Sequence, residues 1–265
     1  MKTTANFLKI ILVIFLVSTF FNCKKDEEET VDNNTPEIQT ATGDIMYIKS
    51  INESNDPVIS FDYDDSHRLS KMTFYFGSTS PEFRCTYDDD KLTKGEVYYD
   101  NVLKFTYVYT YDNSGNLERC DFIDADPDNT DTLYWTFESN NGKIVSIVKH
   151  NNIGPVVKYE LIYADDSVLK TIEYSFNNNN NWDMIGYTEY DCDNKNNPLY
   201  VTQIPFSPSI EEMVWFTNKN NILVKKYYDA DGTLEDTFQS VYTYNDKSYP
   251  ETVVQDGQTN TFTYY

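Results

Sequence analysis

The chain has 265 residues, with 43 acidic against 21 basic side chains and a formal net charge of −22. A surface of that charge repels phosphate backbones, which disfavours nucleic acid as a partner. Aromatic residues make up 16% of the chain, and a chain of this length can bury a sizeable core.

Residues 1–22 form the first predicted element. Lys2 and Lys9 precede or flank an apolar run from Ile10 to Val17, which continues to Phe21. The run is too short for a membrane-spanning helix and is followed by a highly charged segment. We therefore interpret residues 1–22 as a secretory signal peptide.

Cys23 stands directly after the apolar run and resembles the lipid-modified cysteine of bacterial lipoproteins. In that family, cleavage precedes the cysteine and its thiol receives a diacylglycerol. The alternative is a plain signal peptide with a structural Cys23. Residues 23–42 are polar and lack periodicity, so they predict an acidic tether that carries the lipid.

The run Lys24–Glu29 reads KKDEEE. It is similar to the export signal that sends lipoproteins of the Bacteroidetes group to the outer face of the outer membrane. The alternative is a solvated acidic spacer. The resemblance implies that the outer membrane is a partner through the lipid anchor and that the domain faces outside the cell.

Residues 43–265 predict one all-β domain built from hairpin repeats. An aromatic residue recurs just before a turn at intervals of 24 to 28 residues, as Tyr63, Tyr87, Tyr111, Phe137, Tyr163, Tyr190, Phe216 and Tyr244. Positions two and four residues earlier are mostly apolar and the intervening ones mostly polar, which is typical of half-buried antiparallel strands. The turns contain Asp, Asn and Gly, and no stretch predicts an amphipathic helix.

The residues after each turn predict a β-bulge. Leu69 is followed three positions later by Met72, and Leu117 by Cys120, so a step of three interrupts the period of two. About eight hairpins give roughly sixteen strands, whereas an open sheet rarely exceeds ~10. We therefore expect an antiparallel meander rolled into a wide barrel or curved sheet.

The second face of the predicted strands is charged. It carries Asp62, Lys71, Arg84, Glu160 and Glu189. Lipid would penalise these side chains, so the pattern disfavours a transmembrane barrel.

The segment Tyr111–Leu117, YDNSGNL, is similar to the YD repeat of the Rhs and teneurin shells. The dipeptide recurs at Tyr63, Tyr87 and Tyr190, each followed by Asp, and is altered in the other units. A lipoprotein signal followed by about eight such units resembles Bacteroidetes lipoproteins of unknown function with a porin-like fold. The resemblance implies a fold and a cellular location, but no ligand or reaction.

The remaining cysteines predict free thiols. Two strands at ~4.8 Å spacing should separate Cys85 from Cys120 by about 14 Å, beyond disulfide reach, and Cys192 should lie in a turn. No nucleophile motif, histidine pair or phosphate-binding loop points to catalysis, and neither His67 nor His150 has an evident partner. We therefore do not predict an enzyme.

Calcium is the one cofactor that the sequence suggests. An acidic loop contains Asp124, Asp126, Asp128 and Asp131, spaced so that several carboxylates could converge on a hard cation. Residues 229–235 resemble a fragment of a calcium loop. The alternative in both places is a solvated acidic turn.

A ligand site is predicted where the inner face of the repeats loses its apolar character, at Gly186, Glu212 and Ser240. A polar patch beside indole and phenol rings can stack sugar rings and bond their hydroxyls. The candidate residues are Trp182, Thr188, Glu212 and Trp215. The alternative is a frayed or water-filled rim of the sheet.

These observations lead to a surface-exposed, lipid-anchored, non-enzymatic binding module for extracellular glycan or protein as the first hypothesis. The alternative is a structural or assembly scaffold of the cell envelope, which is favoured because the sequence contains no clear group of catalytic or ligand-binding residues. A third hypothesis, a glycan hydrolase, needs a pair of carboxylates, and nothing in the sequence singles one out.

Overall fold

The computed structural model describes residues 45–202 and 210–265. The described residues belong to one compact unit, which contains sixteen β-strands. The predicted signal peptide 1–22, the lipidation at Cys23 and the tether 23–42 lie outside the described residues.

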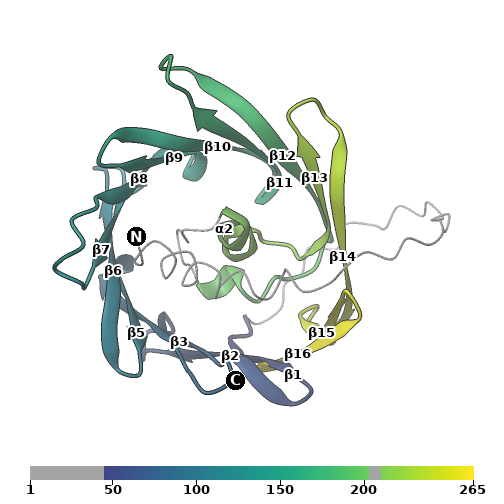
Figure 1. The fold of residues 1–265 in the computed structure, drawn as a ribbon. Coiled ribbons are helices and arrows are strands. Elements are labelled where there is room, and N and C mark those ends of the chain that lie inside the picture. Colours follow the sequence, from purple (N-terminus) through teal and green to yellow (C-terminus); the bar gives the residue numbers. More distant parts are fainter. Residues whose placement is uncertain (1–44, 203–209) are drawn as a thin grey trace. The chain divides into compact units, whose positions relative to one another are not determined.

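The strands form a closed antiparallel barrel in chain order, which confirms the predicted rolled meander (Figure 1). β16 pairs with β1, with Ser50 opposite Thr263 and Ile51 opposite Phe262. The bounds are β1 Ile48–Glu53, β2 Asp56–Tyr63, β3 Leu69–Phe74, β4 Glu82–Asp88, β5 Lys91–Tyr99, β6 Val102–Tyr111, β7 Leu117–Asp124, β8 Leu133–Asn140, β9 Lys143–Asn151, β10 Gly154–Ala164, β11 Ser167–Phe176, β12 Trp182–Cys192, β13 Ile222–Asp229, β14 Leu234–Tyr244, β15 Pro250–Gln255 and β16 Gln258–Tyr264.

The predicted bulges are present just past the turns that follow the repeated aromatic residue. Tyr111 pairs with Leu117 while Thr110 pairs with Arg119, so Glu118 is the extra residue. The same shift separates Leu69 from Lys71, Leu92 from Lys94, Ile144 from Ser146, Val168 from Lys170, Ile222 from Val224 and Pro250 from Thr252. A bulge increases the local twist, which helps a wide sheet to close.

The acidic residue after the tyrosine closes its own turn. Asp112 Oδ1 accepts hydrogen bonds from the backbone N–H groups of Ser114 and Asn116, both at 2.8 Å. Asp64 makes the equivalent pair of bonds, and Asn245 does the same with an amide oxygen. At Asp64 and Asp112, the Asp of the repeated dipeptide therefore has a structural role, which is to cap the turn.

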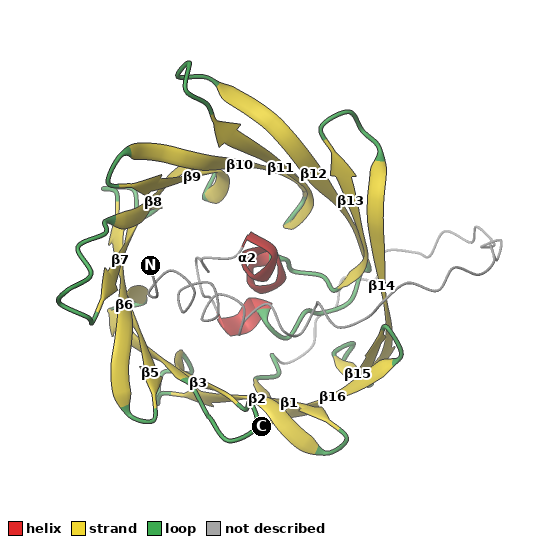
Figure 2. Ribbon diagram, viewed as in Figure 1, coloured by secondary structure: helices red, strands yellow, loops and turns green. Residues whose placement is uncertain are grey.

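The hairpin predicted around Glu212 and Phe216 is wrong, and so is the expectation that the chain has no helix. Ile210–Thr217 form α2, preceded by a short 3₁₀ helix, Tyr200–Thr202 (η1). β12 pairs directly with β13, so this segment has no strand edge beside it. α2 lies inside the barrel (Figure 2), with Met213 and Val214 fully buried against the inner wall. In the described part of the chain, no helix is long and apolar enough to cross a membrane.

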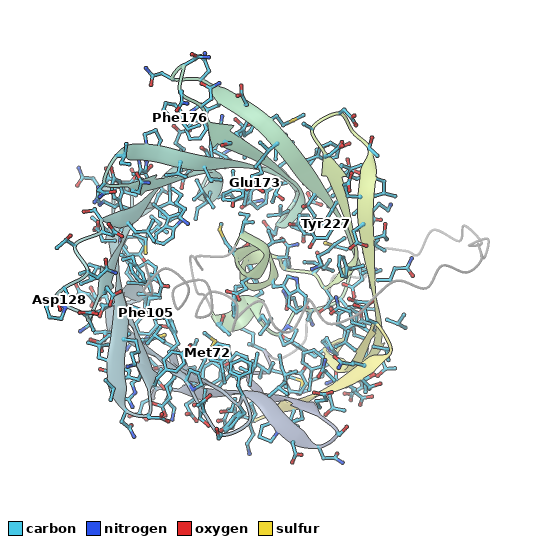
Figure 3. The ribbon with its side chains drawn as sticks, in the orientation of Figure 1. Met72, Phe105, Asp128, Glu173, Phe176 and Tyr227 are labelled. Atoms are coloured by element: carbon cyan, nitrogen blue, oxygen red, sulfur yellow. The ribbon has the colours of Figure 1, made fainter. Side chains whose placement is uncertain are left out.

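The two faces of the sheet differ in character, as the alternation predicted. Glu173 and Tyr227 point into the barrel, whereas Phe176 and Asp128 point away from it (Figure 3). The inner face holds the core, which includes Tyr107, Tyr109, Trp135, Ile147 and Leu161. The outer face carries ion pairs between neighbouring strands, which join Lys71 to Asp62 and Lys170 to Glu189. It also carries ion pairs within one strand, which join Arg84 to Glu82 and Arg119 to Asp121.

Candidate functional site

Trp182 opens β12 and lies on the outer face of the barrel. It pairs with Phe176 across the β11–β12 turn, and the two rings meet edge to face with centroids 4.9 Å apart. The Nζ of Lys158, on β10, lies 5.8 Å from the centre of the indole. Trp182 is half-buried, so part of its ring is available to a ligand.

A hollow of about 560 Å³ extends from Trp182 across the outer face of neighbouring strands. We call it the outer hollow, and its lining is Glu138, Val145, Ser146, Val148, Lys158, Glu160, Leu161, Ile162 and Trp182. Its volume falls within the range of about 300–1,000 Å³ that is typical of small-molecule sites.

Strand register explains why the surface is hollow there. Glu138 on β8 pairs with Ser146 on β9, and Ser146 pairs with Glu160 on β10, so the three side chains form one row across the sheet. Serine is the shortest of the three and is only 9% exposed. Two longer side chains therefore flank a short one. Val145 joins the lining because it is the extra residue of the β8–β9 bulge.

The two carboxylates of this row have different surroundings. Lys158 Nζ lies 2.6 Å from Glu160 Oε1, and the Tyr174 hydroxyl donates to Glu160 Oε2 at 2.9 Å. The hydrogen bond from Lys158, followed by that from Tyr174, holds the pKa of Glu160 below its usual value. Glu138, in contrast, makes no hydrogen bond or ion pair with any described residue.

Elsewhere on the outer face, cations cover the aromatic rings closely. Arg84 lies 4.1 Å from the ring centre of Tyr98, Arg119 lies 3.8 Å from that of Tyr134, and Lys170 lies 3.5 Å from that of Tyr187. Lys158 is closer to Tyr174, at 4.2 Å, than to Trp182, at 5.8 Å. The indole is thus less closely covered than those three rings.

The other three predicted ligand residues belong to the inside of the barrel. Thr188 faces inward from β12, and Glu212 and Trp215 are on α2. Trp215 lies 5.8 Å from the Nζ of Lys225, a lysine of β13 that is only 5% exposed. The structure therefore does not bring Trp182 together with the other three residues, because the sheet separates them.

Glu212 lies near β6. Burial raises the pKa of Tyr107, and the charges of Cys120 and Glu212 add to that rise. The carboxylate of Glu212 thus lies close enough to the Tyr107 hydroxyl to influence it. The sequence pattern had placed residue 212 on a strand, at a position that is apolar in most other repeats. Glu212 does not follow that pattern because it belongs to a helix inside the barrel.

The acidic loop after β7 uses its polar side chains to cap turns. Asp124 Oδ1 accepts the N–H of Asp126, and Asp126 Oδ1 accepts the N–H of Asp128. Asn129 donates to Asp124 Oδ2 at 2.7 Å and accepts the N–H of Asp131. Across the described residues, no group of three or more His, Cys, Asp or Glu side chains is arranged to hold a metal ion. The predicted calcium ligands therefore do not converge in this geometry.

The three cysteines of the barrel are free, as predicted. Cys120 is fully buried, and Cys85 and Cys192 are half-buried. Cys192 ends β12, where the sequence had placed it in a turn.

Sequence reasoning missed most of the outer hollow. The alternation correctly placed Glu160 on the water-facing side. The row of Glu138, Ser146 and Glu160 depends on the register of three strands, which single-strand patterns do not contain.

No protein-family model matches the chain, and no curated protein matches it. The structure is similar to a porin-like protein from Bacteroides uniformis, with a TM-score of 0.50 and 14% identity over 83% of this chain and 96% of that one. A porin-like protein from Bacteroides vulgatus gives a TM-score of 0.41 and 11% identity, over 83% of this chain and 99% of that one. A protein of unknown function from Bacteroides fragilis gives a TM-score of 0.26 and 11% identity, over 60% of this chain and 91% of that one. The first of these shows the fold alone, and the expected porin-like architecture is confirmed. The YD motif remains a resemblance of short segments.

Proposed function

We propose that this chain is a lipid-anchored, non-enzymatic binding protein whose barrel takes an extracellular saccharide in the outer hollow. The observation that carries the proposal is the hollow itself, where a half-exposed indole borders a lining of carboxylate, hydroxyl and ammonium groups. An aromatic face packs against the C–H face of a sugar ring, and the polar groups bond its hydroxyls.

The concave shape favours saccharide over a protein partner. Protein interfaces of standard size bury about 800 Å² on each side, which is far more than one hollow offers. Ser146, Lys158 and Glu160 supply donors and acceptors within the hollow, while Val148 and Ile162 supply apolar walls. Rings that carry both C–H faces and hydroxyl groups match such a lining.

The state of Glu160 supports binding over hydrolysis. A glycosidase that uses two carboxylates needs one of them protonated, with a raised pKa, to act as the general acid. Lys158 and Tyr174 lower the pKa of Glu160, so this carboxylate stays ionised. Ordinary hydrogen bonds to the ligand are the role that this charge distribution supports.

The proposed location on the cell surface rests on Cys23 and the run Lys24–Glu29, which both lie outside the described residues. The charged outer face supports a barrel surrounded by water and held to the outer membrane by the lipid alone. Protease shaving of intact cells should release peptides from residues 43–265. If those peptides appeared only after lysis, the location on the cell surface would be refuted.

Binding is tested with the full chain in detergent, screened by thermal shift against neutral and charged oligosaccharides. We expect at least one saccharide to raise the melting temperature of the wild-type protein. Trp182→Ala should weaken its binding by about tenfold or more, because a lost ring contact costs about 1.5 kcal/mol. Tyr98→Ala removes another outer-face ring away from the hollow and should leave binding unchanged. The proposed site would be refuted if no saccharide raised the melting temperature, or if Trp182→Ala left the rise unchanged.

A further inference from the structure

Glu138 has no ion-pair partner among the described residues, whereas three outward carboxylates of nearby strands have one. Asp121 on β7 is paired with Arg119, Glu160 on β10 with Lys158, and Glu189 on β12 with Lys170. Glu138 on β8 lies opposite Ser146 on β9, which carries no charge. No described residue forms an ion pair with Glu138. The negative charge of Glu138 therefore stands uncompensated at the edge of the outer hollow.

From this uncompensated charge we infer that the saccharide of the outer hollow carries a free amino group, so that it binds as a cation. The inference rests on the proposed function. The ammonium group of one sugar unit lies against the carboxylate of Glu138 and the hydroxyl of Ser146. The ring of another unit covers the indole of Trp182, because β8 and β12 are separated by three strands. A carboxylate–ammonium contact of this kind is a charge-assisted hydrogen bond, about twice as strong as a neutral one.

Two further features of the hollow favour a cation. Its one lysine, Lys158, already bonds Glu160 at 2.6 Å, so the cation that an acidic sugar would need is occupied. The indole of Trp182 also accepts a positive charge, since the Nζ of Lys158 lies 5.8 Å from its centre. Over longer distances, the net charge of −22 attracts cationic ligands and repels anionic ones.

A lysine side chain of a protein is the other source of an ammonium group. It would use Glu138 but leave most of the hollow unfilled, because its stem is narrow and flexible. A hollow of about 560 Å³ with a tryptophan on its border fits rigid rings better. We therefore place the ammonium on a saccharide, and oligolysine serves as the competing probe in the test.

The test is calorimetric titration of the full chain in detergent with two probes of equal length, an oligomer of glucosamine and its fully N-acetylated counterpart. Acetylation removes the positive charge and keeps the ring. We expect the amine form to bind about tenfold more tightly at low salt. The advantage should shrink at about 0.5 M salt, where charges are screened within a few ångströms.

Glu138→Gln keeps the size of the side chain and removes its charge. It should abolish the preference for the amine form and leave the affinity for the N-acetylated form unchanged. Glu118→Gln makes the same change of net charge at an exposed bulge residue outside the hollow, and should keep the preference. Because Glu138 is exposed and unpartnered, its replacement should not affect folding.

The outcomes separate this inference from the proposed function. If both probes bind equally and Trp182→Ala weakens both, the protein binds saccharide but the amino-sugar inference is refuted. If oligolysine binds more tightly than the glucosamine oligomer, the ligand is a basic peptide and the inference is also refuted. If neither saccharide binds and the wider screen finds none, the proposed function itself fails.

Discussion

The hydroxyl of Tyr111 donates a hydrogen bond to the backbone carbonyl of Leu92, at 2.9 Å, across to the preceding hairpin. Tyr87 bonds Leu69 and Tyr163 bonds Ile144 in the same way, each at 2.9 Å. Each acceptor is the residue just before a bulge, where the ladder is locally disrupted. The repeated tyrosine thus ties one hairpin to the one before it.

The first prediction concerns these tyrosines. Tyr111→Phe should lower the free energy of unfolding by about 1 kcal/mol, because it leaves the Leu92 carbonyl without that donor. Tyr63 is the matched control, since its hydroxyl is buried and has no hydrogen-bond partner within the described residues. Tyr63→Phe should therefore be neutral or slightly stabilising in urea denaturation. Equal losses in the two variants would contradict the role of the bond.

A second prediction concerns Asn218, which follows α2 and is fully buried. Its Oδ1 accepts the N–H of Val168 at 2.7 Å, and its Nδ2 donates to Cys192 Sγ at 3.5 Å. Asn218→Ala should cost about 1–3 kcal/mol in urea denaturation, since it leaves a buried N–H unpaired. The half-buried Asn220, which bonds Ser167 and Lys195, is the control, and Asn220→Ala should cost less. A larger loss for Asn220→Ala than for Asn218→Ala would show that the bonds of Asn218 to Val168 and Cys192 do not stabilise the fold.

A third prediction is a loss of stability at alkaline pH. Burial raises the pKa of Cys85 from 9.0 to about 12 and that of Tyr163 from 10.0 to about 12. The unfolded chain releases these protons first, so the folded state binds more protons in this range. Stability from these groups is complete below pH 9 and falls as the pH rises towards 12. The urea midpoint should be constant from about pH 7 to 9 and lower at pH 11. A midpoint unchanged at pH 11 would contradict the burial of these groups.

The fourth prediction concerns two strand glycines. A Cβ at Gly186 would lie 2.7 Å from the backbone oxygen of Tyr228, whereas one at Gly95 would overlap the Phe83 ring. Each Gly→Ala change should cost about 1–3 kcal/mol by overpacking. Phe83→Leu should reduce the cost at Gly95, because a smaller side chain makes room. No side-chain change should rescue Gly186→Ala. Denaturation of the single and double variants measures both effects, and additive losses at Gly95 and Phe83 would contradict the packing.

Much of the site lay beyond sequence reasoning for a physical reason. The alternation correctly assigned Glu160 to the outer face and Thr188 to the inner one, because side chains alternate with a fixed period along a strand. Trp182 follows a turn, where that period is interrupted, and its side could not be read from the pattern. Glu138 and Ser146 became candidates only when the strand pairing placed them in one row with Glu160.

The amino-acid sequence by itself determined the antiparallel meander, the bulges that follow the turns after the repeated aromatic residue and the polarity of the two faces. These features follow from short-range periodicity and turn chemistry, which each hairpin carries within itself. Only the tertiary structure decided that residues 210–217 form a helix inside the barrel. That segment has an apolar pattern that suits a strand as well, but β12 pairs with β13 and leaves it no partner edge. Closure of the barrel and the outer hollow likewise depend on contacts between distant strands, which no local pattern specifies.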